Sequence, residues 1–187
     1  MTTAEDASAG AGDEWWDVLD DAGAPVGERF RRGDPGWPEG RYHLVVGVCP
    51  VRADGRVLVT RRAVSKDWPL DWEFPAGSAL AGEDSPTAAA RELQEETGLS
   101  VAHDDLVLLR RLVEPTAFFD VFTARVADPE VLDLEPSEVC DARWVDLDEV
   151  MRMRDAGDFA DPWLPRLEVV LPMLDGVVVR TAPPVTG

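Results

Sequence analysis

The chain has few cysteines, little positive charge and no long apolar run, and each scarcity excludes a class of protein. Only Cys49 and Cys140 are cysteines among 187 residues, which is too few for a disulfide framework or a zinc site built from thiolates. Basic residues number 18 against 37 acidic ones, so the net charge is −19. This sign disfavours a nucleic-acid partner or an anionic membrane partner. A small phosphorylated substrate is still compatible, because a bound cation reverses the local field.

The apolar segments are short. Residues 44–50 form one of the longest runs, far below the length of a membrane span. The N-terminal segment lacks the basic region and apolar stretch of a secretion signal. We therefore expect a soluble, cytoplasmic protein with no membrane partner.

The length and the hydrophobic fraction of 45% predict one domain with a real core. Residues 1–14 are small, polar and acidic, which predicts a disordered tail. The domain is expected over residues 15–176, and a flexible C-terminal tail over residues 177–187.

Apolar patterning and turn residues predict a mixed order of strands and helices. Strands dominate the first half and helices are inserted later, which favours an α/β class with a partly antiparallel sheet. Strands are expected at 17–20, near Val26, and at 42–51, 57–60, 105–113, 117–127 and 142–146; helices at 85–98, 147–154 and 163–175; and loops at 33–40 and 63–76.

The helix expected over residues 85–98 has the clearest boundaries. Ser85 is a favourable N-cap and Pro86 suits the first helical position. Gly98 suits a left-handed C-cap. Between them, residues 88–96 are nearly all strong helix formers.

Three glutamates, Glu92, Glu95 and Glu96, share one face of this helix, because residues three and four apart are neighbours. Arg91 lies four residues before Glu95 and offsets part of their repulsion. One interpretation is a solvated acidic face, which is common for a run of charge. The other is a divalent-cation site, since carboxylates supply the hard oxygen ligands that Mg²⁺ prefers.

The wider spacing favours the second interpretation. The segment GSALAGEDSPTAAARELQEETGL, from Gly77 to Leu99, matches G-x5-E-x7-R-E-U-x-E-E-x-G-U at every specified position, where U is aliphatic. Seven fixed residues match a given window by chance at about 10⁻⁸ with average residue usage. The chain therefore resembles the Nudix hydrolases.

The resemblance implies an α/β/α sandwich with a mixed sheet, in which the motif forms a loop, a helix and a loop. It implies hydrolysis of a small-molecule diphosphate, a nucleoside diphosphate linked to another moiety, with Mg²⁺ or Mn²⁺ as cofactor. It also implies a possible homodimer. By position, the metal ligands would be Glu92, Glu95, Glu96 and the backbone at Gly77. Arg91 would orient these carboxylates, and Glu83 would tie the loop to the helix.

The general base has two candidates. Glu95 is one, and the other is Glu138, six residues before Trp144 on a loop that leads into a late strand. Some Nudix enzymes carry an active carboxylate at this spacing. The alternative for Glu138 is an ordinary loop acid.

Arg61, Arg62 and Lys66 form a basic cluster ahead of the motif. Residues 59–66 resemble the diphosphate-binding segment of type I isopentenyl-diphosphate isomerases, which implies that Arg62 and Lys66 bind the diphosphate. The alternative is a set of exposed charges at a strand end. His43 matches a metal-binding histidine of those isomerases by its spacing, but a single histidine beside an apolar strand also suits a structural role.

The isomerase resemblance has two departures. Those enzymes carry a cysteine immediately before the first glycine of the motif and a histidine after it, whereas this chain has Ala76 and Ser78. Cys49 cannot replace that cysteine because it lies on an apolar strand, where a buried small hydrophobe is expected. We therefore favour an isomerase-like branch of the Nudix hydrolases. The alternatives are a catalytically silent ligand sensor and, less favoured, an isomerase.

The aromatic residues do not identify the organic part of the substrate. They are candidates for stacking on a base and equally for the core; they are Trp37, Trp68, Trp72, Phe118 and Phe119.

Overall fold

The centre of the molecule is a mixed sheet. The structure, a computed structural model, describes residues 14–127 and 131–181. In the main sheet the strand order is β5-β4-β3-β8-β7, with β6 paired to β3 and β9 paired to β4. The strands are β3 (His43–Val51), β4 (Val57–Arg62), β5 (Trp72–Glu73), β6 (Ala76–Ser78), β7 (Leu106–Val113), β8 (Ala117–Arg125) and β9 (Val139–Val145). β3 and β8 run parallel, and the other pairs are antiparallel.

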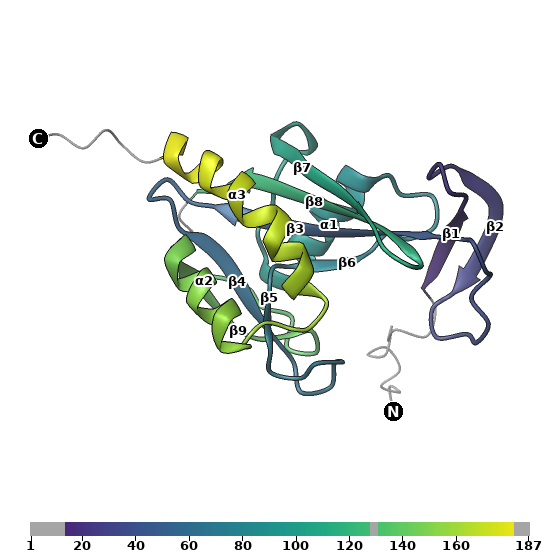
Figure 1. Cartoon of the computed structure of the whole chain (residues 1–187), viewed down its shortest axis with the longest axis horizontal. Coiled ribbons are helices and arrows are strands. Elements are labelled where there is room, and N and C mark those ends of the chain that lie inside the picture. Colours follow the sequence, from purple (N-terminus) through teal and green to yellow (C-terminus); the bar gives the residue numbers. More distant parts are fainter. Residues whose placement is uncertain (1–13, 128–130, 182–187) are drawn as a thin grey trace, which may run out of the picture.

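Helices cover both faces of this sheet (Figure 1). On one face, α1 (Ser85–Thr97) packs Ala89 and Leu93 against apolar side chains of β3 and β4. On the other, α2 (Leu147–Ala156) and α3 (Trp163–Thr181) pack on a second apolar cluster. A 3₁₀ turn, η1 (His103–Asp105), precedes β7. The predicted α/β/α sandwich with a mixed sheet is therefore confirmed.

A separate hairpin stands beside the start of β3, at the right of Figure 1. It consists of β1 (Trp15–Leu19) and β2 (Pro25–Arg31), close to the two strands predicted there. One of its faces carries Trp16, whose ring stacks on His43 with centroids 4.4 Å apart. The Ala81 amide also donates to the Trp15 carbonyl at 2.7 Å. The hairpin is thus fixed to the loop that leads into α1.

The start of α1 corrects one prediction. The N-cap is Asp84 rather than Ser85, because the Asp84 carboxylate accepts from the Thr87 amide at 3.0 Å. Ser85 Oγ instead donates to Asp120 at 2.6 Å. The other end agrees with the prediction, since Gly98 has φ 75 in the left-handed region. The helix predicted over residues 147–154 is confirmed as α2 (Leu147–Ala156), which begins after Asp146, whose carboxylate accepts from the Glu149 amide at 2.7 Å.

Two further predictions were wrong in extent. Residues 63–76 are not one loop, since β5 and the start of β6 lie within them; strands of two and three residues are too short to give a periodic pattern. The last helix does not end at residue 175 but continues through Pro172 to Thr181. Val177 and Val178 pack on the apolar cluster beneath α3, so packing outweighs the lost hydrogen bond at the proline. Residues 177–181 are therefore helical, whereas the rest of the predicted C-terminal tail lies outside the described residues, as do residues 1–13.

Within residues 14–127 and 131–181, no helix has the length and apolar content needed to cross a bilayer.

Candidate active site

The three glutamates of α1 lie in different environments. The side chain of Glu95 is 57% exposed, that of Glu92 is 14% exposed, and Glu96 is buried. A solvated acidic face is therefore wrong for Glu92 and Glu96. Their carboxylates are directed into the protein.

Glu96 has an unusual electrostatic situation. Its Oε2 atom is buried and has no hydrogen-bond partner. Burial raises the pKa of Glu96 well above its ordinary value, and the neighbouring carboxylates of Glu73 and Glu92 raise it further. A buried polar atom without a partner destabilises a protein, and a buried carboxylate does so strongly. A cation at this position would remove that penalty.

Glu92 lies directly against the backbone of β6. A Cβ atom added at Gly77 would stand 2.2 Å from the carboxyl carbon of Glu92, so only glycine allows this contact. Burial raises the pKa of Glu92 to about 7, although Arg91 opposes the shift. Carboxylates beside an open backbone are hard oxygen donors of the kind that Mg²⁺ and Mn²⁺ take. The residues present therefore fit a divalent cation.

Arg91 links the loop before α1 to the helix. Its Nε and Nη2 atoms donate to the two oxygens of Glu83 at 2.9 Å, and Nη2 also donates to the Ser78 carbonyl at 3.1 Å. Its Nη1 atom donates to Glu92 and Glu95, each at 2.9 Å. The structure thus brings Arg91, Glu83, Glu92 and Glu95 into one network. A metal bound by Glu92 and Glu95 would compete with Arg91 for their oxygens.

No group of three or more histidine, cysteine, aspartate or glutamate side chains in the described part of the chain is already arranged to hold a metal.

The basic cluster is paired with carboxylates. Arg62 Nη1 donates to both oxygens of Glu73 at 2.7 Å, and Arg62 Nε donates to the Asp67 carbonyl at 2.6 Å. Lys66 Nζ contacts the Glu138 carboxylate. The isomerase resemblance implies that Arg62 and Lys66 bind a diphosphate, and this stays a prediction. In the structure Arg62 pairs with the buried Glu73, and Lys66 is the more exposed of the two basic side chains, at 21% against 13%.

Sequence reasoning missed Glu73. This residue on β5 is buried, and burial raises the pKa of its carboxyl, while Arg62 and Lys66 oppose the shift. Its charge also acts on Glu96. The available signal was a single carboxylate within the apolar segment of residues 72–76. A carboxylate in such a segment is expected to be buried, and buried acids are seldom found without a partner.

The contacts of His43 and the burial of Cys49 fit structural roles. His43 Nδ1 bonds with the Thr116 carbonyl at 2.9 Å while its ring stacks on Trp16, and burial lowers its pKa. Cys49 is fully buried, as predicted, and burial raises the pKa of its thiol.

A mixed sheet between helical layers, with a loop, helix and loop that carry buried glutamates beside a glycine backbone, defines an enzyme domain of the Nudix class. In agreement, the model of the NUDIX domain matches residues 41–167. The chain belongs to the Nudix hydrolase family and acts as a hydrolase on pyrophosphate bonds.

Two curated relatives illustrate this kinship. An uncharacterized Nudix hydrolase of Listeria monocytogenes is 36% identical over 152 residues, which cover 78% of this chain and 88% of the relative. An isopentenyl-diphosphate Delta-isomerase of Brevibacterium linens is 32% identical over 158 residues, which cover 79% and 85%. The resemblance to both hydrolases and isomerases agrees with the one drawn from the sequence.

Solved structures share the fold. A crystal structure from Deinococcus radiodurans superposes with a TM-score of 0.64 at 21% identity, over 91% of this chain and 100% of that one. An Ap4A hydrolase binary complex from C. elegans gives a TM-score of 0.54 at 18% identity, over 73% and 98%.

Proposed function

We propose that this protein uses Mg²⁺ or Mn²⁺ to hydrolyse the pyrophosphate bond of a nucleoside diphosphate linked to another moiety, or of a related organic diphosphate. Glu92, Glu95, Glu96 and the backbone at Gly77 would hold the cation. The observation that carries the proposal is the buried, unpartnered Oε2 atom of Glu96, because a divalent cation supplies the partner that the protein lacks.

When bound, such a cation neutralises negative charge on the diphosphate and makes water more acidic. The side chains of the protein would orient the metal ligands, bind the phosphate and accept a proton. Arg91 holds Glu92 and Glu95 in a fixed orientation. The ammonium group of Lys66 would bind a substrate phosphate. This would release Glu138, its present partner, to take a proton from the attacking water. Glu95 is the other candidate base.

Isomerisation is the less favoured activity. The residue before Gly77 on β6 is Ala76, which has no proton-donating group, and the residue after it is Ser78. Hydrolysis, in contrast, needs no acid at these two positions, because the proposed groups are the glutamates of α1, a divalent cation and Lys66.

A substrate panel tests the proposal. Dinucleotides, nucleoside diphosphate sugars, nucleoside triphosphates and isoprenoid diphosphates would be incubated with the full chain and Mg²⁺ or Mn²⁺, and phosphate and nucleotide release measured. We expect turnover of at least one class that stops with a chelator and returns with metal. Metal-stimulated binding without turnover of any class would instead favour the ligand sensor, and conversion of isopentenyl diphosphate to its isomer would favour the isomerase.

Substitution of Gly77 gives a prediction about the metal. In Gly77→Ala the new methyl group would displace the Glu92 carboxylate, and we expect Mg²⁺ affinity, measured by calorimetry, to fall about 10- to 100-fold. The matched control is Gly176→Ala on α3, where an added Cβ meets nothing within 4 Å. It should bind Mg²⁺ normally and be slightly more stable, because alanine favours helix. Equal affinity in both variants would refute the assigned contact.

The pKa of Glu92 gives a prediction about pH. Its pKa of about 7 in the folded protein lies above the ordinary value of 4.5. Between these two pH values the metal-free folded protein therefore binds this proton more tightly than the unfolded chain does. The stability that this carboxyl contributes is therefore lost as pH rises through about 7. Mg²⁺ requires the ionised form, so the rise in Tm on adding Mg²⁺ should be larger at about pH 8 than at about pH 6. Thermal scans with and without metal measure this, and a pH-independent rise would contradict it.

A further inference from the structure

The loop between β4 and β5 carries two residues in an unfavourable backbone conformation. Trp68 has φ 49 and Leu70 has φ 66, and in residues 14–127 and 131–181 these are the non-glycine residues with positive φ. Large side chains disfavour this region for steric reasons. Both side chains are also substantially exposed, Trp68 at 42% and Leu70 at 41%, so burial in the core does not compensate for the strain.

The end of β4 holds this conformation. Arg62 Nε donates to the Asp67 carbonyl at 2.6 Å and Arg61 Nε donates to the Leu70 carbonyl at 2.7 Å, one on each side of Trp68. The Leu70 amide in turn donates to the Arg62 carbonyl at 3.2 Å. Two arginine side chains therefore fix the backbone of an exposed loop. Strained positions that the surroundings enforce are concentrated at functional sites.

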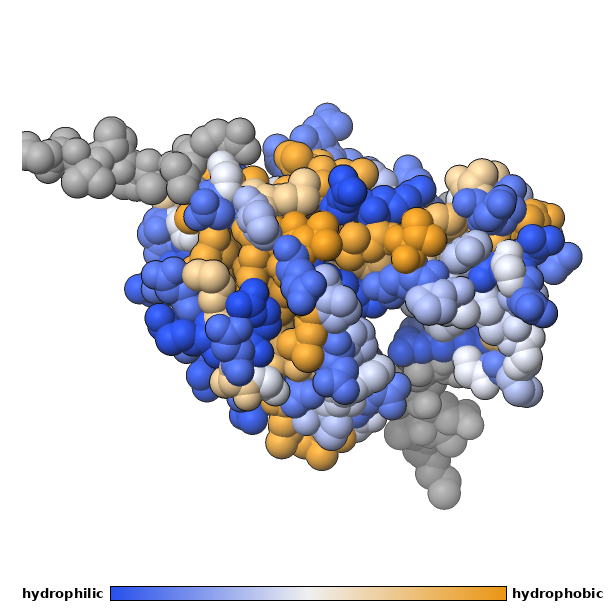
Figure 2. All heavy atoms as spheres, in the orientation of Figure 1, coloured by the Kyte–Doolittle hydropathy of each residue, from blue (hydrophilic) through white to orange (hydrophobic). Residues whose placement is uncertain are grey.

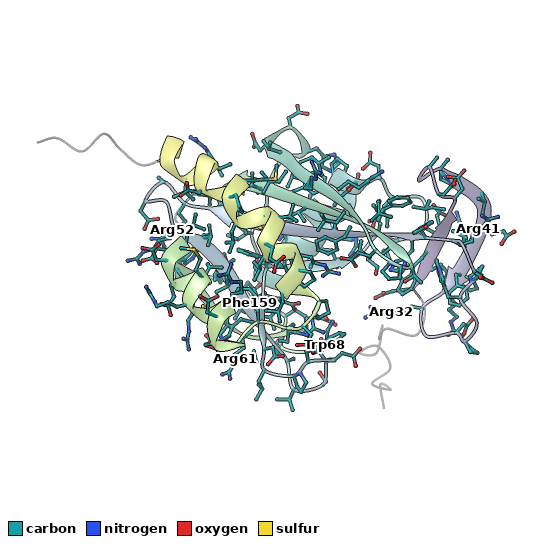
Figure 3. All side chains as sticks on the ribbon, viewed as in Figure 1. Arg32, Arg41, Arg52, Arg61, Trp68 and Phe159 are labelled. Atoms are coloured by element: carbon teal, nitrogen blue, oxygen red, sulfur yellow. The ribbon has the colours of Figure 1, made fainter. Side chains whose placement is uncertain are left out.

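The loop borders the candidate active site. Lys66, two residues before Trp68, contacts Glu138, and Ser65 Oγ donates to the Ser137 carbonyl at 3.2 Å. Arg62 reaches inward to Glu73, whose charge acts on Glu96. Figure 2 shows a hollow between the β4–β5 loop and the β1–β2 hairpin. Figure 3 labels Trp68 on this loop and Arg32, which directly follows β2.

We propose that Trp68 and Leu70 form an apolar subsite for the organic group of the diphosphate substrate. This inference rests on the proposed function, because the position of the subsite follows from phosphate binding by Lys66. Trp68 and Leu70 follow Lys66 by two and four residues on the same exposed loop, so a group attached to a phosphate at Lys66 would be within reach of an indole and an isobutyl side chain. These offer an apolar face to a nucleobase ring or to a hydrocarbon chain. A bare diphosphate gains nothing from them.

Binding of non-hydrolysable ligands tests the subsite without depending on turnover. Three probes would be titrated by calorimetry in Mg²⁺: methylenediphosphonate, α,β-methylene adenosine diphosphate and a prenyl methylenediphosphonate. We expect one of the two larger probes to bind the wild type at least about 10-fold more tightly than methylenediphosphonate, a typical gain from stacking or apolar contact. The identity of that probe distinguishes a nucleobase from a hydrocarbon.

The variants Trp68→Gly and Leu70→Gly separate a binding role from a structural one. Glycine accepts positive φ, so these variants should keep or raise the Tm. They should also lose most of the gain from the organic group while binding methylenediphosphonate normally. The matched control is Leu108→Ala on β7, at the opposite edge of the sheet, where Leu108 is 49% exposed; it should bind all three probes like the wild type.

The outcomes are distinguishable. Equal binding of the three probes by the wild type, or normal binding of the larger probe by both glycine variants, overturns the subsite and leaves the proposed function intact. A fall in Tm together with weaker binding of all probes shows a structural role and also overturns it. Failure of the wild type to bind any probe overturns the diphosphate site of the proposed function, and the subsite with it.

Discussion

Replacing Glu96 with glutamine is expected to lower kcat by about 10²- to 10³-fold, the scale of losing a central electrostatic group, while the folded protein becomes more stable without metal. The carboxylate is buried, its Oε2 atom has no partner, and its pKa is raised well above the ordinary value by burial. A neutral amide removes the penalty of ionising this group in the interior, so the metal-free Tm at about pH 8 should rise. The same change removes a charged ligand, so Mg²⁺ should no longer raise the Tm.

The control for this experiment is Glu168→Gln, an exposed position on α3. It changes the net charge equally but should leave kcat, Tm and the Mg²⁺ effect unchanged. Steady-state kinetics with a substrate from the panel, together with thermal scans, give all three measurements. Near-normal turnover of a folded Glu96→Gln enzyme would refute the ligand role.

Arg91→Ala is expected to lower the free energy of unfolding by about 3 kcal/mol, the lower end of the range for breaking a buried ionic network, and to reduce activity strongly. The side chain is 20% exposed and bonds to Glu83, Glu92 and Glu95. Its loss leaves three carboxylates close together without a cation and detaches the loop from α1. Urea unfolding measures the change in stability.

Mg²⁺ should restore part of the stability lost in Arg91→Ala, because it supplies positive charge to the same carboxylates. The stability of Arg91→Lys should lie between that of Arg91→Ala and the wild type, since a compact ammonium group keeps the charge but lacks the planar guanidinium that bonds Glu83 through two nitrogens and reaches Glu92 and Glu95 with the third. The control is Arg152→Ala on α2, an exposed i,i+3 pair with Glu149, which should unfold like the wild type. A similar stability loss in Arg91→Ala and Arg152→Ala would contradict the network.

Much of the fold could be predicted because its signals are local. The start of α2 follows from Asp146, whose side chain caps the amides of the next few residues. The prediction failed where distant contacts decide. Asp84 rather than Ser85 caps α1, since Ser85 is drawn to Asp120 on β8, and α3 passes through Pro172 because the residues beyond it have an apolar cluster to cover.

The sequence by itself determined the family, the helix that carries the glutamates and the glycine beside them, because a fixed spacing on one helix turns directly into a shared face. Only the tertiary structure decided that Glu96 is buried without a partner, that Glu73 neutralises Arg62, and that Trp68 is held in a strained conformation at the edge of the site. Burial, ion pairing and backbone strain depend on segments that are far apart in the chain, and no local pattern of residues records which of them will meet.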